Sequence, residues 1–187
     1  ISYKTPVEEI RAKNPKGIIF TGGPNSVYLD TSPRMGKEIF ELGVPILGIC
    51  YGAQFLVLGL GGTVTEANEN AVAEFGRTDC KFDNSSPLFS GLKENSVVWM
   101  SHNDHIETLP EGFRSICHSD KCPYGAIENP GKKFYGTQFH PEVNHTEQGF
   151  DMLGNFLYKV CGCMGDWTME EYAQTAIREI REKVGDG

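Results

Sequence analysis

The sequence predicts an α/β protein built on a mixed, mainly parallel sheet. Between residues 17 and 62, short apolar runs alternate with helical segments, an order typical of parallel strands with helices on the faces of the sheet. From residue 63 to 143 the pattern changes to short alternating segments broken by turns, which indicates further strands of mixed direction. The 187 residues, 39% of them hydrophobic, are enough for one domain with a sizeable core.

The first third of the chain predicts four elements. They are a strand within residues 17–23, a helix within 31–43, a buried strand within 44–49 and an apolar helix within 51–62. The second element has its own boundary signals: Ser32 is suited to cap the helix, Pro33 to occupy its first position and Gly43 to end it.

Two helices are predicted after the short strands. The first spans residues 147–160, where Phe150, Leu153, Leu157 and Val160 are spaced for one buried face. The second follows Thr168, which would form a capping box with Glu171. Its apolar side chains form one stripe, which needs a surface to pack on: Tyr172, Ala176, Ile177, Ile180 and Val184.

Composition excludes several classes of function. The net charge of −8, with 17 scattered basic residues, argues against binding to nucleic acid. No apolar stretch is long enough to span a membrane and the first residues do not resemble a signal peptide, so we expect a cytoplasmic protein. The cysteines are expected to be reduced. No set of four ligands at zinc-finger spacing occurs, even around Cys117 and Cys122 or Cys161 and Cys163, so no metal is expected.

Cys50 is the candidate nucleophile. It lies in the pentapeptide Gly48-Ile49-Cys50-Tyr51-Gly52, the thiol form of the nucleophile elbow, in which a sharp strand-to-helix turn leaves no room for side chains on either side of the nucleophile. The start of the following helix favours the thiolate. A core cysteine between incidental glycines is the alternative interpretation of the pentapeptide.

The candidate general base is His140, with Glu142 as its orienting group. They follow a strand-like run and are joined by a stiffening proline, and a thiol nucleophile requires such a pair. His102 and His105 are weaker candidates, since no acid is paired with them in a comparable way, although Asp104 is near. Backbone N–H groups of Tyr51 and of Gly23, with Gly22 as the alternative, are expected to form the oxyanion hole.

Three segments, "TGGPNS", "GICYGAQ" and "GTQFHPEV", occur in an order and spacing that resemble the class I, triad-type glutamine amidotransferases. The segments "EFGR", "VWMSHND" and "GDWTM" are similar to the GMP synthase branch of this family. The resemblance implies a flavodoxin-like, three-layer fold. It also implies hydrolysis of glutamine through a Cys50 thioester, with Cys50, His140 and Glu142 as the triad and with Gln54, His102 and Asn103 in contact with the substrate.

The resemblance also implies an organisation beyond catalysis. Residues 1–163 would form the glutaminase domain, apparently without the strand and helix that open the family fold, and 164–187 would be a linker helix. That linker leads towards an ATP pyrophosphatase domain, where ATP and Mg²⁺ drive the amination of XMP to GMP by ammonia. No cofactor is expected in the glutaminase domain, and the full enzyme could form a homodimer.

Three alternatives remain open from the sequence. One is the glutaminase of another amidotransferase, serving CTP or anthranilate synthesis. Another is a γ-glutamyl cysteine hydrolase, which would have no need of the final helix. The third is a non-catalytic interaction module, which would require the loss of a triad residue.

Overall fold

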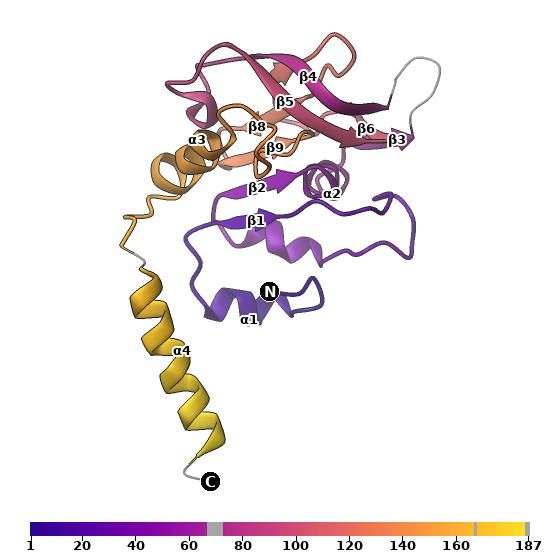
Figure 1. The fold of residues 1–187 in the computed structure, drawn as a ribbon. Coiled ribbons are helices and arrows are strands. Elements are labelled where there is room, and N and C mark those ends of the chain that lie inside the picture. The colour runs from indigo at the N-terminus through magenta and orange to yellow at the C-terminus, as the bar shows by residue number, and fades with distance from the viewer. Residues whose placement is uncertain (67–72, 167, 186–187) are drawn as a thin grey trace.

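The computed structural model describes residues 1–66, 73–166 and 168–185, except the side chains of Glu171 and Glu179. Seven strands form one sheet in the order β1-β2-β9-β8-β7-β4-β5, and two form a small second sheet, β3-β6 (Figure 1). The strands are β1 (Ile18–Phe20), β2 (Ile46–Ile49), β3 (Thr63–Glu66), β4 (Glu74–Phe82), β5 (Asn95–His102), β6 (Asp104–Thr108), β7 (Arg114–His118), β8 (Ala126–Asn129) and β9 (Phe134–Thr137).

The predicted mixed α/β sheet is confirmed. Strands β1, β2 and β9 are parallel, with Ile49 in register with Thr137, so the chain leaves β2 and β9 at the same edge of the sheet. The other strand pairs of this sheet, β9-β8, β8-β7, β7-β4 and β4-β5, are antiparallel. The parallel part is therefore smaller than the prediction implied.

Helices cover both faces of the sheet, because the side chains of its strands alternate between two apolar cores. Ile46 packs in one core with helix α2 (Tyr51–Gly59) and the 3-10 helix η1 (Lys37–Glu41). Leu47 packs in the other with α3 (Gly149–Gly154), the π-helix η3 (Asn155–Val160) and the short η2 (Pro87–Phe89). This is the expected three-layer arrangement.

The helix predicted within residues 31–43 is only partly present. Its helical part is η1, which begins after Gly36, and Ser32 does not cap it. The Ser32 hydroxyl instead donates to the Ser26 carbonyl (2.6 Å), and the Arg34 guanidinium donates to the Val27 carbonyl. These hydrogen bonds hold the chain in a loop, so the helical part begins later in the sequence than predicted. Gly43 follows η1 at φ +73°.

The helix predicted within residues 147–160 forms as α3 and η3, but its buried face was predicted only in part: Val160 is buried and Leu153 packs against the core. Phe150 is 68% exposed and Leu157 is 37% exposed. The buried side chains are Met152, Phe156 and Val160, which recur every four residues along a segment that ends in π-helical hydrogen bonding. Tertiary packing therefore buries Met152 and Phe156, whereas the apolar spacing in the sequence had suggested Phe150 and Leu157.

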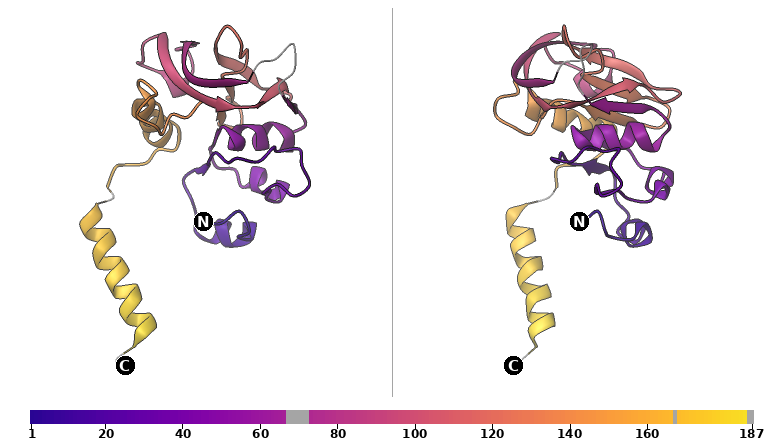
Figure 2. Two further views of the ribbon diagram at one scale, coloured as in Figure 1. Left: turned by 45° about the vertical axis from the view of Figure 1, so that its right-hand side comes forward. Right: turned by 90° about the vertical axis from the view of Figure 1, so that its right-hand side faces the viewer.

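Of the two terminal helices, only the C-terminal one was predicted from the sequence. Helix α1 (Val7–Ala12) was not predicted, although Pro6 precedes it and Glu8 and Glu9 occupy its first turn. Helix α4 (Met169–Val184) was predicted and projects away from the rest of the molecule (Figure 2). The Glu171 side chain of the predicted capping box lies outside the described residues. No described helix combines the length and the apolar character needed to cross a membrane.

Candidate active site

Cys50 occupies a strained turn between β2 and α2. Its backbone has φ +50° and ψ −106°, a conformation that is costly for a residue with a side chain. A Cβ atom on Gly48 would lie 2.5 Å from the Ala53 nitrogen, and one on Gly52 would collide with the Phe20 carbonyl. Both glycines are therefore required by the close approach of the backbone, as the elbow pattern predicts.

The Cys50 thiol is 6% exposed and lies among polar groups. The sulfur is 3.7 Å from the Ser101 carbonyl oxygen, to which the thiol can donate, and the Gln138 side-chain Nε2 lies 3.8 Å from it. The Cys50 backbone N–H donates to the Thr137 carbonyl (2.7 Å). These contacts fix the sulfur at the carboxyl edge of the parallel strands.

His140 lies three residues beyond the end of β9, next to Cys50. Its backbone N–H donates to the Trp99 carbonyl (3.0 Å), and its carbonyl accepts from the Thr146 hydroxyl (2.6 Å). The imidazole Nδ1 lies 2.7 Å from Glu142 Oε1. A protonated Nδ1 donating to this carboxylate leaves Nε2 as the ring nitrogen available to the thiol.

The electrostatics of the pair favour a charged imidazole. Hydrogen bonds with Cys50 and then with Glu142 raise the pKa of His140 to about 10, against the opposing effect of burial. Burial acts to raise the pKa of Glu142, but the hydrogen bond from His140, a backbone hydrogen bond and the charge of His140 together outweigh it, so the net direction is down. The carboxylate therefore stays ionised at neutral pH, and the imidazole beside the Cys50 sulfur carries a positive charge.

The loop after β1 lies against these side chains. A Cβ on Gly22 would be 3.0 Å from His140 Cε1 and 3.6 Å from Cys50 Cβ, whereas one on Gly23 would be 3.7 Å from Tyr51 Cγ. The two expected donors of an oxyanion hole, the Gly23 and Tyr51 N–H groups, therefore belong to segments that touch. Gly22 is the glycine that directly faces Cys50 and His140.

The residues expected to contact the substrate are brought to the same region, with different exposures. Gln54 is 3% exposed, and its Nε2 donates to the Asp104 carbonyl (3.0 Å) and to Gln138 Oε1 (3.2 Å). His102 is 5% exposed and its Nδ1 lies 3.0 Å from that same carbonyl. Asn103 is exposed. Only Asn103 of these three has a side chain that is open to solvent.

Sequence reasoning missed Gln138 in this network, and it missed the role of the Asp104 backbone carbonyl. Gln138 is 1% exposed and links Gln54 to the Cys50 sulfur. A buried polar side chain needs partners, and a glutamine within the run "YGTQFH", two residues before His140, was a usable signal. Asp104 acts through its backbone carbonyl, which no sequence pattern indicates.

The other cysteines are unpaired and differ from Cys50 in their surroundings. Burial raises the pKa of Cys117 well above its usual value, and raises that of Cys122 to about 12 and that of Cys161 to about 11. These thiols stay protonated at neutral pH in the absence of a metal. Within the described part of the chain, Glu74, His102 and Cys122 form a group whose atoms could bind a metal ion.

A cavity of about 700 Å³ lies along β1, lined in part by Ile18, Gly23, Tyr51 and Phe55. Neither Cys50 nor His140 lines it. Gly22 and Gly23 are part of its lining, so the cavity adjoins the loop beside the candidate site without including the two reactive side chains.

Comparisons with known proteins identify the family of this chain. Residues 1–160 match the family model of class-I glutamine amidotransferases. The chain is 55% identical over 186 residues to a GMP synthase [glutamine-hydrolyzing] of Clostridium novyi and 53% identical to that of Clostridium botulinum strain Hall. It is covered completely in both matches but spans only 36% of the length of each relative.

Solved structures give the same fold. A putative GMP synthase subunit from Thermoplasma acidophilum aligns with a TM-score of 0.73 at 29% identity, over 97% of this chain and 83% of the other. A glutamine amidotransferase from Thermotoga maritima aligns with a TM-score of 0.61 at 24% identity, over 83% of this chain and 65% of the other. From the family match over residues 1–160 and the fold, this chain belongs to the class-I glutamine amidotransferase family.

Proposed function

We propose that this chain is the glutamine-hydrolysing part of a GMP synthase. The observation that carries the proposal is the strained Cys50 turn beside the His140–Glu142 pair, whose nitrogen and oxygen are 2.7 Å apart. The identity of 55% to a GMP synthase supports the choice of branch within the family. The chain spans about a third of such relatives, so the synthetase reaction is assigned to another domain or subunit.

In the proposed reaction, Cys50 attacks the side-chain carbonyl of glutamine. His140 accepts the thiol proton and donates it to the departing nitrogen, so that ammonia leaves and a γ-glutamyl thioester remains. Water, deprotonated by His140, then attacks the thioester and releases glutamate and the free thiol. Glu142 holds the imidazole in the required tautomer and stabilises its cation.

Two further groups of residues have proposed roles. The backbone N–H groups of Gly23 and Tyr51 stabilise the oxyanion of each tetrahedral intermediate, with Gly22 as the alternative to Gly23. Gln54 shapes the substrate site from α2. The segment of His102 and Asn103 contacts the amino-acid end of glutamine through its backbone and the exposed Asn103 side chain.

The ammonia is used in a reaction outside these residues. We place residues 1–163 in the glutaminase domain and 164–187 in a linker towards an ATP pyrophosphatase domain. There ATP, with Mg²⁺, activates XMP for amination to GMP. The apolar stripe of α4 is exposed, with Ile180 at 60% and Val184 at 70%, as suits a helix that docks on another domain. We place the enzyme in the cytoplasm, with dimerisation of the full enzyme as its proposed assembly.

The proposal is tested by trapping with 6-diazo-5-oxo-L-norleucine, a reactive mimic of glutamine, followed by mass spectrometry of the digested protein. Labelling confined to Cys50 and blocked by glutamine is the expected result. Cys161, which is partly exposed, serves as the internal control for unspecific alkylation. Equal labelling of both cysteines, or protection of neither by glutamine, would contradict the assignment.

A further inference from the structure

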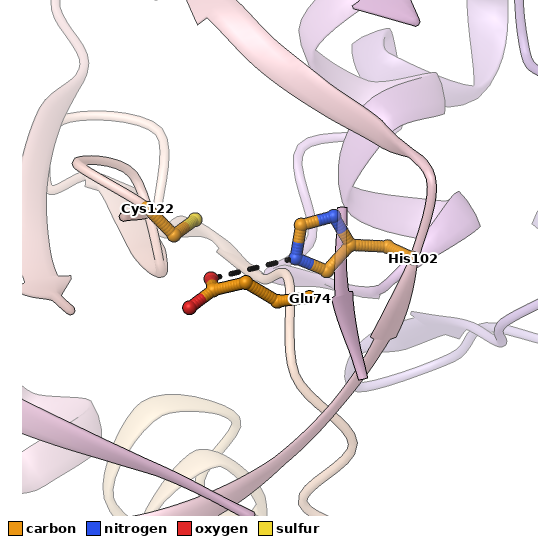
Figure 3. A group of neighbouring side chains, drawn as sticks. All are labelled: Glu74, His102 and Cys122. Carbon is orange, nitrogen blue, oxygen red and sulfur yellow. Dashed lines mark ion pairs between the residues drawn. The ribbon is translucent and has the colours of Figure 1, made fainter. Parts of the chain in front are cut away.

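Glu74, His102 and Cys122 form a buried cluster that the proposed reaction does not use. Glu74 and His102 are directly opposite each other on the antiparallel strands β4 and β5. Cys122 comes from the turn between β7 and β8 and points its sulfur at the other two side chains (Figure 3). Their exposed fractions are 7%, 5% and 5%, so the three groups share a site that is nearly closed to solvent.

The donor atoms converge on one point. One nitrogen, one carboxylate oxygen and one sulfur lie within 4.8 Å of one another, and His102 Nε2 is 3.8 Å from Glu74 Oε2. Donors around a tetrahedral zinc ion are about 3.3–3.7 Å apart, given metal–ligand bonds of about 2.0–2.3 Å. Small side-chain movements would therefore bring these atoms into a coordination shell.

The state of His102 points to a missing ligand. Its Nδ1 lies 3.0 Å from the Asp104 carbonyl oxygen, which can only accept a hydrogen bond. Nδ1 therefore carries a proton, which leaves Nε2, facing Glu74 and Cys122 (Figure 3), as the ring nitrogen that could bind a metal ion. This nitrogen has no hydrogen-bond partner among the described residues, although the side chain is only 2% exposed. Metal-binding histidines in proteins are held by a backbone carbonyl in this way.

A second layer of contacts fixes the other two ligands. The Ser119 hydroxyl lies 3.1 and 3.3 Å from the two oxygens of Glu74. The same hydroxyl accepts from the Cys122 N–H at 2.9 Å, and the Ser119 N–H donates to the Cys122 carbonyl at 3.0 Å. One side chain therefore positions both the carboxylate and the turn that carries the thiol.

We propose that Glu74, His102 and Cys122 bind a zinc ion, with water as the fourth ligand. The mixture of sulfur, nitrogen and oxygen donors suits Zn²⁺ and does not suit the harder Mg²⁺ or Ca²⁺. Binding forms a Zn–S bond as the Cys122 thiol loses its proton to water. The ion, one thiolate, one carboxylate and a neutral imidazole sum to zero charge, which is compatible with burial.

The site would act on the proposed active site through His102. Its ring shares the Asp104 carbonyl with Gln54, and Gln54 contacts Gln138 beside the Cys50 sulfur. A zinc ion on Nε2 would fix the ring and with it the segment 101–104, whose Ser101 carbonyl lies 3.7 Å from the same sulfur. The metal would be structural and would hold the substrate side of the site in place.

The test is titration of the reduced full chain, freed of metal by a chelator, with Co²⁺ as a spectroscopic substitute for zinc, followed by displacement with Zn²⁺. We expect one equivalent to bind and to give a thiolate-to-cobalt charge-transfer band with the intense visible bands of a tetrahedral site. Cys122→Ser should lose the charge-transfer band. Cys117→Ala, a change at a neighbouring buried thiol, and Cys50→Ala, at the proposed nucleophile, should both keep it.

Two results would overturn the proposal. One is the absence of a stoichiometric thiolate–cobalt band in the folded wild-type chain, as judged by circular dichroism. The other is a band that survives Cys122→Ser or disappears with Cys50→Ala, which would place the ion at the candidate active site. Should Cys122→Ser fail to fold, Ser119→Ala replaces it. Loss of this second-layer contact should weaken Zn²⁺ binding by about tenfold to a hundredfold, and unchanged affinity would contradict the site.

Discussion

The Nδ1 atom of His140 lies 2.7 Å from Oε1 of Glu142, two residues further along the chain. The pair is placed by hydrogen bonds of the His140 backbone to Trp99 and Thr146, not by the strand itself. The imidazole is thereby held in one orientation beside Cys50 before any substrate binds. Such preorganisation is what a proton shuttle in acyl transfer requires.

Glu142→Gln should lower the rate of glutamine hydrolysis by roughly 10²-fold while leaving the fold intact. The amide keeps the size of the carboxylate but removes the charge that stabilises the imidazolium and fixes its tautomer. The kcat of glutamine hydrolysis should carry most of the loss and KM little. Glu147→Gln, a change at an exposed carboxylate paired with Arg77, is the control. An unchanged kcat in Glu142→Gln would remove Glu142 from the proposed mechanism.

The raised pKa of His140 predicts a pH dependence of stability. His140 binds its proton more tightly in the folded chain than in the unfolded chain, so its protonation stabilises the fold. This stabilisation is complete below the unfolded pKa of about 6.5 and is lost as the pH rises towards the folded pKa of about 10. The free energy of unfolding should fall by roughly 1–2 kcal/mol over that window, a modest figure because His140 and Glu142 are both partly exposed and solvent screens their charges. Urea unfolding at several pH values measures it.

The control for this pH dependence is Cys50→Ala. The hydrogen bond with Cys50 is the largest cause of the raised pKa of His140, so the variant should lose most of the slope above about pH 6.5. His140→Gln should lose all of the slope that His140 contributes. A slope that persists unchanged in both variants would assign the pH dependence to other groups.

The sequence was informative where backbone geometry demands one kind of residue. No residue with a side chain fits at Gly48 or Gly52 beside the strained Cys50. The two glycines therefore made the Cys50 turn predictable. The spacing of His140 and Glu142 was equally direct, since both belong to one short segment. For the same reason the parallel strands β1 and β2 and the helix α2 were found near their observed bounds.

The sequence was misleading where tertiary contacts decide. Ser32 has the chemistry of a helix cap but donates instead to a carbonyl six residues earlier. Phe150 fits the apolar spacing of α3 yet faces solvent, because Met152 and Phe156 match the opposing core. The cluster of Glu74, His102 and Cys122 joins three distant segments through the register of β4 and β5, which no local pattern reveals.

Cys50→Ala should abolish glutamine-dependent synthesis of GMP in the full enzyme and leave synthesis from free ammonia close to the wild-type rate. In the proposed function the nucleophile is needed only to release ammonia, and the amination is assigned to another domain or subunit. Assays with glutamine and with an ammonium salt as the nitrogen source, on the same preparation, separate the two reactions. Loss of both activities would mean that Cys50 serves the structure rather than the chemistry.

Gly48→Ala should destabilise the protein by about 1–3 kcal/mol or prevent folding, because its Cβ would lie 2.5 Å from the Ala53 nitrogen and from the Gly52 carbonyl group. The matched control is Gly154→Ala in α3, where the new Cβ would lie 3.9 Å from its closest neighbour, an atom of Tyr158. That change should raise stability by about 0.5–1 kcal/mol, since alanine favours the helix. Thermal unfolding of both variants measures the difference. Equal stability of the two would mean that the Cys50 turn can relax, and that the proposed nucleophile is not held by its flanking glycines.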